Sequence, residues 1–164
     1  MRIETPRLVI RSFTRSDIPD YAAIVADPAV MKYLGNGAPL SRGAADAYVE
    51  DCLRSERDLG YARYAVLLRA AEKLIGFSGF KLINGYVDFG YRLAAEHWGS
   101  GYATEAGRAV IAYGFEQLGL KSIVATADMR NAGSIRVIEK LGFTFERTDG
   151  FSDHAAARYV LERS

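Results

Sequence analysis

The residues best suited to chemistry form a glycine-rich stretch, residues 97–107, with the sequence His-Trp-Gly-Ser-Gly-Tyr-Ala-Thr-Glu-Ala-Gly. A strand-like run over 87–93 precedes it and a helical pattern over 102–118 follows. The first amides of a helix lack internal partners, and its dipole places about half a positive charge there. Gly99 and Gly101 let a ligand approach this backbone closely. The junction therefore predicts an anion site, with pyrophosphate as its natural ligand.

Two familiar glycine motifs are excluded. A Walker loop needs Lys and Ser/Thr after its last glycine, and Gly101-Tyr102-Ala103 supplies neither. A dinucleotide fingerprint follows the first strand of a βαβ unit, whereas this loop lies late in the chain. A plain glycine turn before a core helix remains the alternative interpretation.

Composition favours one globular domain over residues 1–164, with 49% hydrophobic residues. Lys and Arg number 21 against 20 Asp and Glu, a net charge of +1. This balance argues against a nucleic-acid coat or a polybasic membrane tether. Apolar runs such as 64–68 are too short to span a bilayer, so we expect a cytoplasmic protein. Cys52 is the single cysteine, which predicts a core residue and neither a disulfide nor a metal site.

The hydrophobic patterns predict an α+β fold. The Asn84-Gly85 pair between two strand-like runs predicts a type I′ hairpin. Small residues at 103, 107 and 114 predict a helix that lies close on a sheet. In chain order, we expect a strand at 8–13, helices at 17–25 and 41–58, strands at 61–69, 74–83 and 86–93, a helix at 102–118, a strand at 121–127, a helix at 131–141, and strands at 143–145 and 158–161.

Two motifs carry a family resemblance. The string Trp98-Gly-x-Gly-Tyr-Ala-Thr-Glu-Ala106 resembles motif A of the GCN5-related N-acetyltransferases (GNAT), in the RimJ/RimL branch, although Trp98 stands where the wider family has Gln or Arg. The pattern Asn131-x-x-Ser134-x-x-x-Ile138-x-x-x-Gly-Phe143 resembles motif B and follows in the family's order. The resemblance extends over nearly the whole chain, with a generic first third.

The resemblance implies a mixed, mostly antiparallel sheet of about seven strands, splayed at its centre and flanked by about four helices. Acetyl-CoA is expected as a co-substrate, bound in the notch where the strand before motif A and the strand before motif B splay apart. No metal is expected. The implied contacts are backbone groups of Tyr91, Arg92 and Leu93, the loop and helix start formed by Trp98, Gly99, Ser100, Gly101, Tyr102, Ala103 and Thr104, and the side chain of Asn131. An N-cap role alone is the alternative for Asn131.

The implied reaction is direct transfer of acetyl from the thioester to an amine. Asp88 stands where RimL-like relatives often carry Glu, and it is the candidate to accept the amine's proton through water or to hold its charge. An exposed strand residue without a role is the alternative. Glu105 is a weaker candidate because it suits a helix N-terminus. A backbone amide near residues 89–91 is the expected oxyanion donor.

One departure concerns the proton donor to the thiolate. Many relatives carry a tyrosine seven residues after the Asn, and Ile138 takes that place here. Ser134, a water or Tyr102 remain candidates, and a thiolate can also leave unprotonated. Ser134 is alternatively a plain residue in the first turn of its helix. A non-catalytic acyl-CoA sensor is the rival to an enzyme.

The acceptor side carries no motif. A protein N-terminus, a polyamine, an aminoglycoside or an amino acid remain open, as do monomer and homodimer. Residues 151–154 either line the acceptor pocket or form an ordinary loop. We expect His97 to be a solvated neighbour of the glycine loop, and His97 and His154 show no spacing typical of zinc or of a hydrolase triad.

Overall fold

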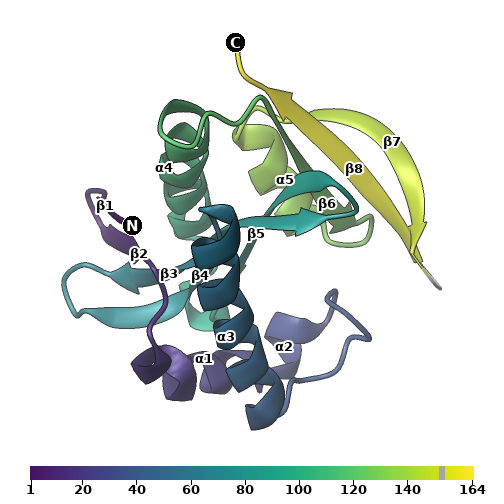
Figure 1. Cartoon of the computed structure of the whole chain (residues 1–164). Coiled ribbons are helices and arrows are strands. Elements are labelled where there is room, and N and C mark those ends of the chain that lie inside the picture. Colours follow the sequence, from purple (N-terminus) through teal and green to yellow (C-terminus); the bar gives the residue numbers. More distant parts are fainter. Residues whose placement is uncertain (152–153) are drawn as a thin grey trace.

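A computed structural model describes residues 1–151 and 154–164 (Figure 1). Within this part the strands form one sheet of eight, in the order β1-β2-β3-β4-β5-β6-β8-β7. The strands are β1 (Arg2–Glu4), β2 (Leu8–Arg11), β3 (Arg63–Leu68), β4 (Lys73–Ile83), β5 (Tyr86–Leu93), β6 (Ser122–Asp128), β7 (Thr144–Phe151) and β8 (His154–Glu162). The α-helices are α1 (Ile18–Val25), α2 (Pro28–Met31), α3 (Arg42–Leu59), α4 (Tyr102–Glu116) and α5 (Ala132–Lys140), with 3-10 turns at Arg15–Asp17 and Ala95–His97.

Helices cover the sheet on both faces, with α1, α2 and α3 grouped together away from α4 and α5 (Figure 1). On the first face Tyr48 of α3 stacks between Tyr21 and Phe77, with ring centroids 5.1 and 5.3 Å away. On the other face a Cβ at Gly114 of α4 would lie 2.7 Å from the Phe80 ring. The prediction that small residues let this helix lie close on the sheet is confirmed.

The centre of the sheet is where its strands separate. β5 and β6 run parallel and pair in register at Asp88 and Val124. Beyond that pair, the two strands diverge toward their carboxyl ends, so the sheet opens between Phe89–Leu93 and Ala125–Asp128. The predicted parallel pairing and central splay are both confirmed.

The hairpin between β4 and β5 has the predicted turn, because Asn84 and Gly85 both have positive φ, 49° and 82°. The mixed, mostly antiparallel α+β fold is confirmed as well, with small differences in count. Arg2–Glu4 adds an edge strand, giving eight instead of about seven, and the short α2, capped by Asp27, gives five helices instead of about four.

The last hairpin is longer than predicted. Strand β7 spans Thr144–Phe151 and β8 spans His154–Glu162, where strands at 143–145 and 158–161 were expected. Residues 144–150 of β7 are mostly exposed on both faces, so they lack the apolar alternation that marks a strand in sequence. Of the stretch 151–154, residues 152 and 153 lie outside the described residues.

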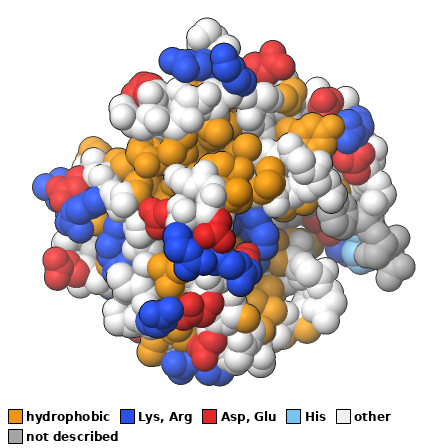
Figure 2. Space-filling view, in the orientation of Figure 1, with side chains coloured by type: hydrophobic (Ala, Val, Ile, Leu, Met, Phe, Trp, Pro, Cys, Tyr) orange, Lys and Arg blue, Asp and Glu red, His pale blue; other side chains and the backbone are white. Residues whose placement is uncertain are grey.

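Charged side chains of both signs are interspersed on the face shown in Figure 2. Within the described residues, no helix combines the length and the apolar character that crossing a bilayer requires.

Candidate active site

A cavity of about 130 Å³ lies where β5 and β6 separate. Its lining includes Arg63, Asp88, Gly90 and Arg92 from the sheet and Asn131, Ser134 and Ile138 at α5. The cavity therefore joins the two faces of the sheet at the only parallel strand pair among the described residues.

Strand β5 sends alternate side chains to opposite faces. Arg92 points to the α1–α3 face, where its Nη1 donates to Tyr21 Oη at 2.8 Å. Phe89 points to the α4–α5 face, where its ring stacks 5.9 Å from Phe143. Asp88 and Gly90 thus share the Arg92 face, and Tyr91 shares the Phe89 face. Two ligands that enter from opposite faces can meet at this strand.

Asp88 forms a buried ion pair with Arg63. Arg63 Nη2 donates to Asp88 Oδ1 at 2.9 Å, and the two side chains are 15% and 12% exposed. The alternative of an exposed strand residue is therefore wrong. Burial raises the pKa of Asp88 to about 6, although the Arg63 guanidinium opposes the rise. At neutral pH the carboxylate is mostly ionised, and its pKa lies close to the value that suits a general base.

Arg63 is a site residue that sequence reasoning missed. Its Nη1 donates to Tyr48 Oη at 3.3 Å and its guanidinium lies 5.3 Å from the Phe77 ring. The available signal was a charged residue at the start of an otherwise apolar strand. Such a charge is retained in a buried strand when it has a partner, and here the partner is Asp88, 25 residues away.

The predicted cofactor residues fall in two places. Tyr91, Arg92 and Asn131 line the cavity, while Leu93, 3% exposed at the end of β5, is not part of its lining. Trp98–Thr104 lie beyond the end of β5, and the Trp98 indole ties them to it by donating to the Leu93 carbonyl at 2.9 Å. The structure therefore holds the start of the loop against the carboxyl end of β5.

The first turn of α4 has free amides. Gly101, the N-cap, adopts φ 82° and has no side chain to cap the helix. Within residues 1–151 and 154–164, no acceptor takes a hydrogen bond from the amides of residues 102–104. The loop therefore retains the donors that an anion requires.

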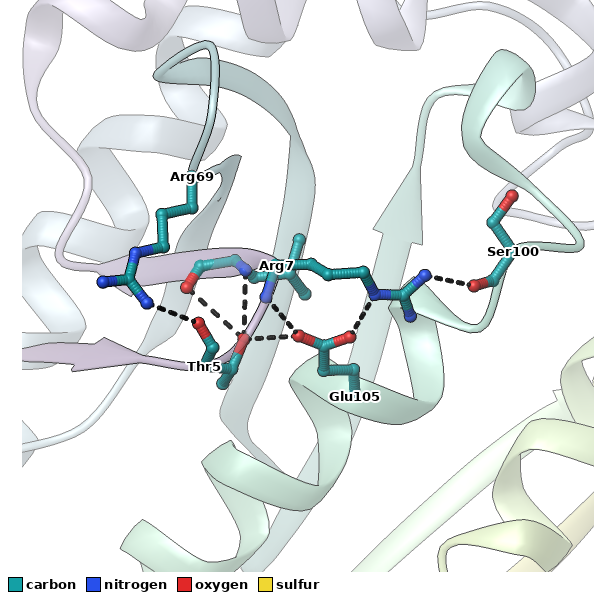
Figure 3. A network of polar contacts seen from close by, with 6 residues as sticks. Thr5, Arg7, Arg69, Ser100 and Glu105 are labelled. Carbon is teal, nitrogen blue, oxygen red and sulfur yellow. Dashed lines mark hydrogen bonds and ion pairs between the residues drawn. The ribbon is translucent and has the colours of Figure 1, made fainter.

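The N-terminal segment holds this loop in place (Figure 3). Glu105 accepts from Thr5 Oγ1 at 2.6 Å, from the Arg7 amide at 2.9 Å and from Arg7 Nε at 2.7 Å. Arg7 Nη1 in turn donates to the Ser100 carbonyl at 2.8 Å. Both carboxylate oxygens of Glu105 accept hydrogen bonds, and the residue does not line the cavity. Glu105 therefore stabilises the loop and is not a candidate base.

The comparison with protein families decides the identity of the fold. The model of the acetyltransferase (GNAT) domain matches residues 7–144. The chain belongs to the GNAT family. It is an N-acetyltransferase of this family, as the sequence predicted.

Relatives and solved structures agree with the GNAT assignment. The chain is 33% identical to the uncharacterized N-acetyltransferase p20 of Bacillus licheniformis over 149 residues, 87% of this chain and 82% of that protein. It is 33% identical to the uncharacterized N-acetyltransferase YnaD of Bacillus subtilis, over 92% and 85% of the two chains. A GNAT acetyltransferase from Bacillus anthracis has a TM-score of 0.86 at 26% identity, over 99% and 98% of the chains. RimL in complex with coenzyme A has a TM-score of 0.85 at 18% identity, over 99% and 98%, a likeness of fold.

The GNAT motif B residues surround the cavity at α5. Asn131 caps the helix, because its Oδ1 accepts from the Ser134 amide at 3.1 Å, and its side chain also lines the cavity. Ile138, in the tyrosine position of many GNAT members, is 3% exposed and presents only hydrocarbon to the cavity. Burial raises the pKa of the neighbouring Tyr91, and the Ser134 hydroxyl opposes this rise. Tyr102 is not part of the lining, and the Arg7 guanidinium lies 4.3 Å from the centroid of its ring.

The remaining nucleophilic and metal-binding candidates have structural positions. Cys52 is buried, and burial raises the pKa of its thiol to about 12, which confirms the prediction of a core residue. His97 lies beside the glycine loop with its ring 6.1 Å from Tyr102. Its side chain is only 16% exposed and its Nε2 is buried, so the expectation of a solvated residue is wrong. The described residues contain no group of three or more His, Cys, Asp and Glu side chains placed to hold a metal ion.

Proposed function

We propose that this GNAT acetyltransferase transfers an acetyl group from acetyl-CoA directly to a primary amine, on a protein N-terminus or a small molecule. The observation that carries the proposal is the position of the Asp88–Arg63 pair. The pair lines a cavity at the strand separation, and the loop after β5 carries the free amides of α4.

The proposed position of CoA follows from these donors. The pyrophosphate binds the loop formed by Trp98–Thr104, where the amides of α4 and its dipole favour negative charge. The pantetheine arm runs into the notch and pairs with the unpaired edge of β5 at Tyr91, Arg92 and Leu93, as an added strand would. Asn131 meets the arm from the opposite side. The thioester then reaches the cavity between Asp88 and Ser134.

The reaction needs a base first. Asp88 accepts a proton from the acceptor's ammonium group, directly or through water, and the freed nitrogen lone pair attacks the thioester carbonyl carbon. A backbone amide between Phe89 and Tyr91 stabilises the oxyanion. The carbon–sulfur bond breaks and CoA leaves as its thiolate. Of the two protons left on nitrogen, one passes to solvent and the other stays on the amide product. Ser134, beside Tyr91, relays a proton from solvent to the thiolate and so keeps its own hydroxyl proton.

A non-catalytic acyl-CoA sensor is the second candidate, favoured by one observation. Ile138 offers no proton where many relatives have a phenol. Release of free thiol from acetyl-CoA, measured with a panel of primary amines, separates the two functions. We expect acceptor-dependent release. Tight CoA binding without any such release would favour the sensor.

A further inference from the structure

Arg92 brings a positive charge into the cavity without an acidic partner. Its Nη1 donates to Tyr21 Oη at 2.8 Å, and no carboxylate within residues 1–151 or 154–164 lies within 4.0 Å of its guanidinium. Its Nε is buried and has no hydrogen-bond partner. Among the residues that the structure describes, at least one donor of this guanidinium thus has no acceptor.

The other charged groups that line the cavity are neutralised. Arg63 is paired with Asp88 at 2.9 Å, and Asp128 is paired with Arg130 at 2.7 Å. Arg92 therefore gives the cavity one uncompensated positive charge. The charge lies on the α1–α3 face, opposite the face of Phe89 and α4.

Aromatic rings stabilise Arg92 only in part. Its guanidinium lies 5.2 Å from the Phe77 ring and 5.7 Å from the Tyr48 ring, distances at which cation–π attraction acts. The rings accept no hydrogen bond in the plane of the guanidinium, so they leave Nε unsatisfied. A planar anion such as a carboxylate satisfies both the charge and the in-plane donors.

The spacing along β5 relates this group to the candidate base. Asp88 and Arg92 lie four residues apart on the same face, so their Cα atoms are separated by about 13 Å along an extended strand. Arg92 and Asp88 both line the same small cavity. A volume of about 130 Å³ is below the roughly 300–1,000 Å³ of sites for drug-sized ligands.

We propose that the acceptor is a small amine that also carries a carboxylate, such as a free amino acid, with its amine at Asp88 and its carboxylate at Arg92. This inference rests on the proposed function and narrows its acceptor. Polyamines and aminoglycosides bring a second positive charge toward Arg92, so the cavity disfavours them. A protein N-terminus offers a neutral amide where the proposed acceptor has its carboxylate.

The test uses the full-length protein, acetyl-CoA and matched acceptors. Thiol release is measured with a panel of L-amino acids, with the corresponding amino-acid amides, and with spermidine and kanamycin. Among the amino acids that react, we expect kcat/KM to exceed that of the amide at least about tenfold, since a charge-assisted hydrogen bond is lost in the amide. We expect spermidine and kanamycin to react less well than either.

A variant tests the role of Arg92 itself. We expect Arg92→Gln to bring the kcat/KM for an amino acid close to the kcat/KM for its amide. The ratio of these two values is compared between the variant and the wild type, because the difference in basicity between the two amines then cancels. Arg42→Gln, which removes an exposed guanidinium paired with Asp46 on α3, is the control and should keep the wild-type ratio.

Several outcomes would overturn the inference. The inference is wrong if amino-acid amides or polyamines react as well as the amino acids with the wild-type protein, a result that requires no variant. It is also wrong if folded Arg92→Gln keeps the wild-type ratio of amino-acid to amide kcat/KM. Weaker CoA binding in Arg92→Gln, measured by calorimetry, with an unchanged ratio would assign Arg92 to a CoA phosphate instead. Absence of CoA binding and of release with every amine would overturn the proposed function as well.

Discussion

The guanidinium of Arg63 lies in the space that a side chain at position 90 would need. A Cβ built on Gly90 would lie 2.7 Å from Arg63 Nη2 and 2.9 Å from its Cζ. Glycine at this position therefore lets the Arg63 side chain, which comes from β3, lie against β5 and reach Asp88. The buried ion pair depends on the absence of a side chain between its members.

Gly90→Ala is expected to displace Arg63 from Asp88. The added methyl makes the close contact without backbone strain, because Gly90 does not have a positive φ. We expect kcat/KM to fall at least tenfold and the free energy of unfolding to fall by about 1–3 kcal/mol. Gly43→Ala on α3 is the matched control, with no atom within 4 Å, and it should be neutral or stabilising. Wild-type kinetics in Gly90→Ala would show that the pair needs no such space.

The raised pKa of Asp88 leads us to expect that activity depends on pH. Its pKa is raised to about 6 by burial, so the proportion able to accept a proton falls as the pH falls below 6. We expect kcat/KM to decline about tenfold per pH unit below that value. Asp88→Asn should lower kcat/KM by about 10²–10⁴-fold and remove the limb near pH 6. Asp46→Asn on the surface of α3 is the control. An intact acid limb in Asp88→Asn would exclude Asp88 as the base.

Substitutions of Gly101 test whether the loop binds the phosphates of CoA. Gly101→Asp is expected to abolish CoA binding, because it places a carboxylate against the phosphates. Gly101→Asn is the matched variant, since Asn has a similar shape, tolerates the positive φ of 82° and carries no charge. Calorimetric titration with CoA should show much weaker binding for the Asp variant than for the Asn variant. Equal affinity in the two variants and the wild type would refute the loop as the phosphate site.

A substitution of Ser134 tests whether this residue protonates the CoA thiolate. Ser134→Ala is expected to lower kcat about tenfold with little change in the KM for acetyl-CoA, because a thiolate leaves less readily without a proton. The effect should be modest, since a thiolate is a tolerable leaving group at neutral pH. Pre-steady-state measurement of thiol release checks this step directly. An unchanged rate would leave water as the proton source.

A substitution of Glu105 tests how much its hydrogen bonds contribute to the stability of the protein. Its partial burial opposes ionisation, but hydrogen bonds from Thr5 and Arg7 outweigh it and hold the pKa of Glu105 below its usual value. The stabilisation is therefore present above the unfolded-state pKa of about 4.3 and is lost as the pH falls through the lower folded-state pKa. Glu105→Gln should cost about 1–3 kcal/mol at pH 7 and flatten the acid dependence of stability.

Denaturant unfolding at several pH values measures this effect of Glu105. Glu116→Gln, on the exposed side of the same helix, is the control and should keep the wild-type pH dependence. Equal stability losses in both variants at every pH would contradict a special role for the Thr5 and Arg7 contacts.

Several features of the fold and site were predictable because contiguous residues encode them. The positive φ values at Asn84 and Gly85 follow from the residue types themselves. The free amides at α4 follow from Gly101 at its start, because glycine has no side chain to cap them. The order of the two motifs likewise predicted the GNAT family and the separation of β5 from β6.

Tertiary structure decided which of these residues act together. By itself, the sequence left Asp88 either in the site or exposed, since a single strand residue has no determined face or partner. Packing buried it against Arg63, 25 residues away, and joined Arg7 to Glu105 across 98 residues. Such contacts depend on strand register and on helices that cover the sheet, which are properties of the whole chain. For that reason the sequence determined the fold family and the glycine loop that leaves the first amides of α4 free, while only the folded structure determined the charge and partners of the cavity.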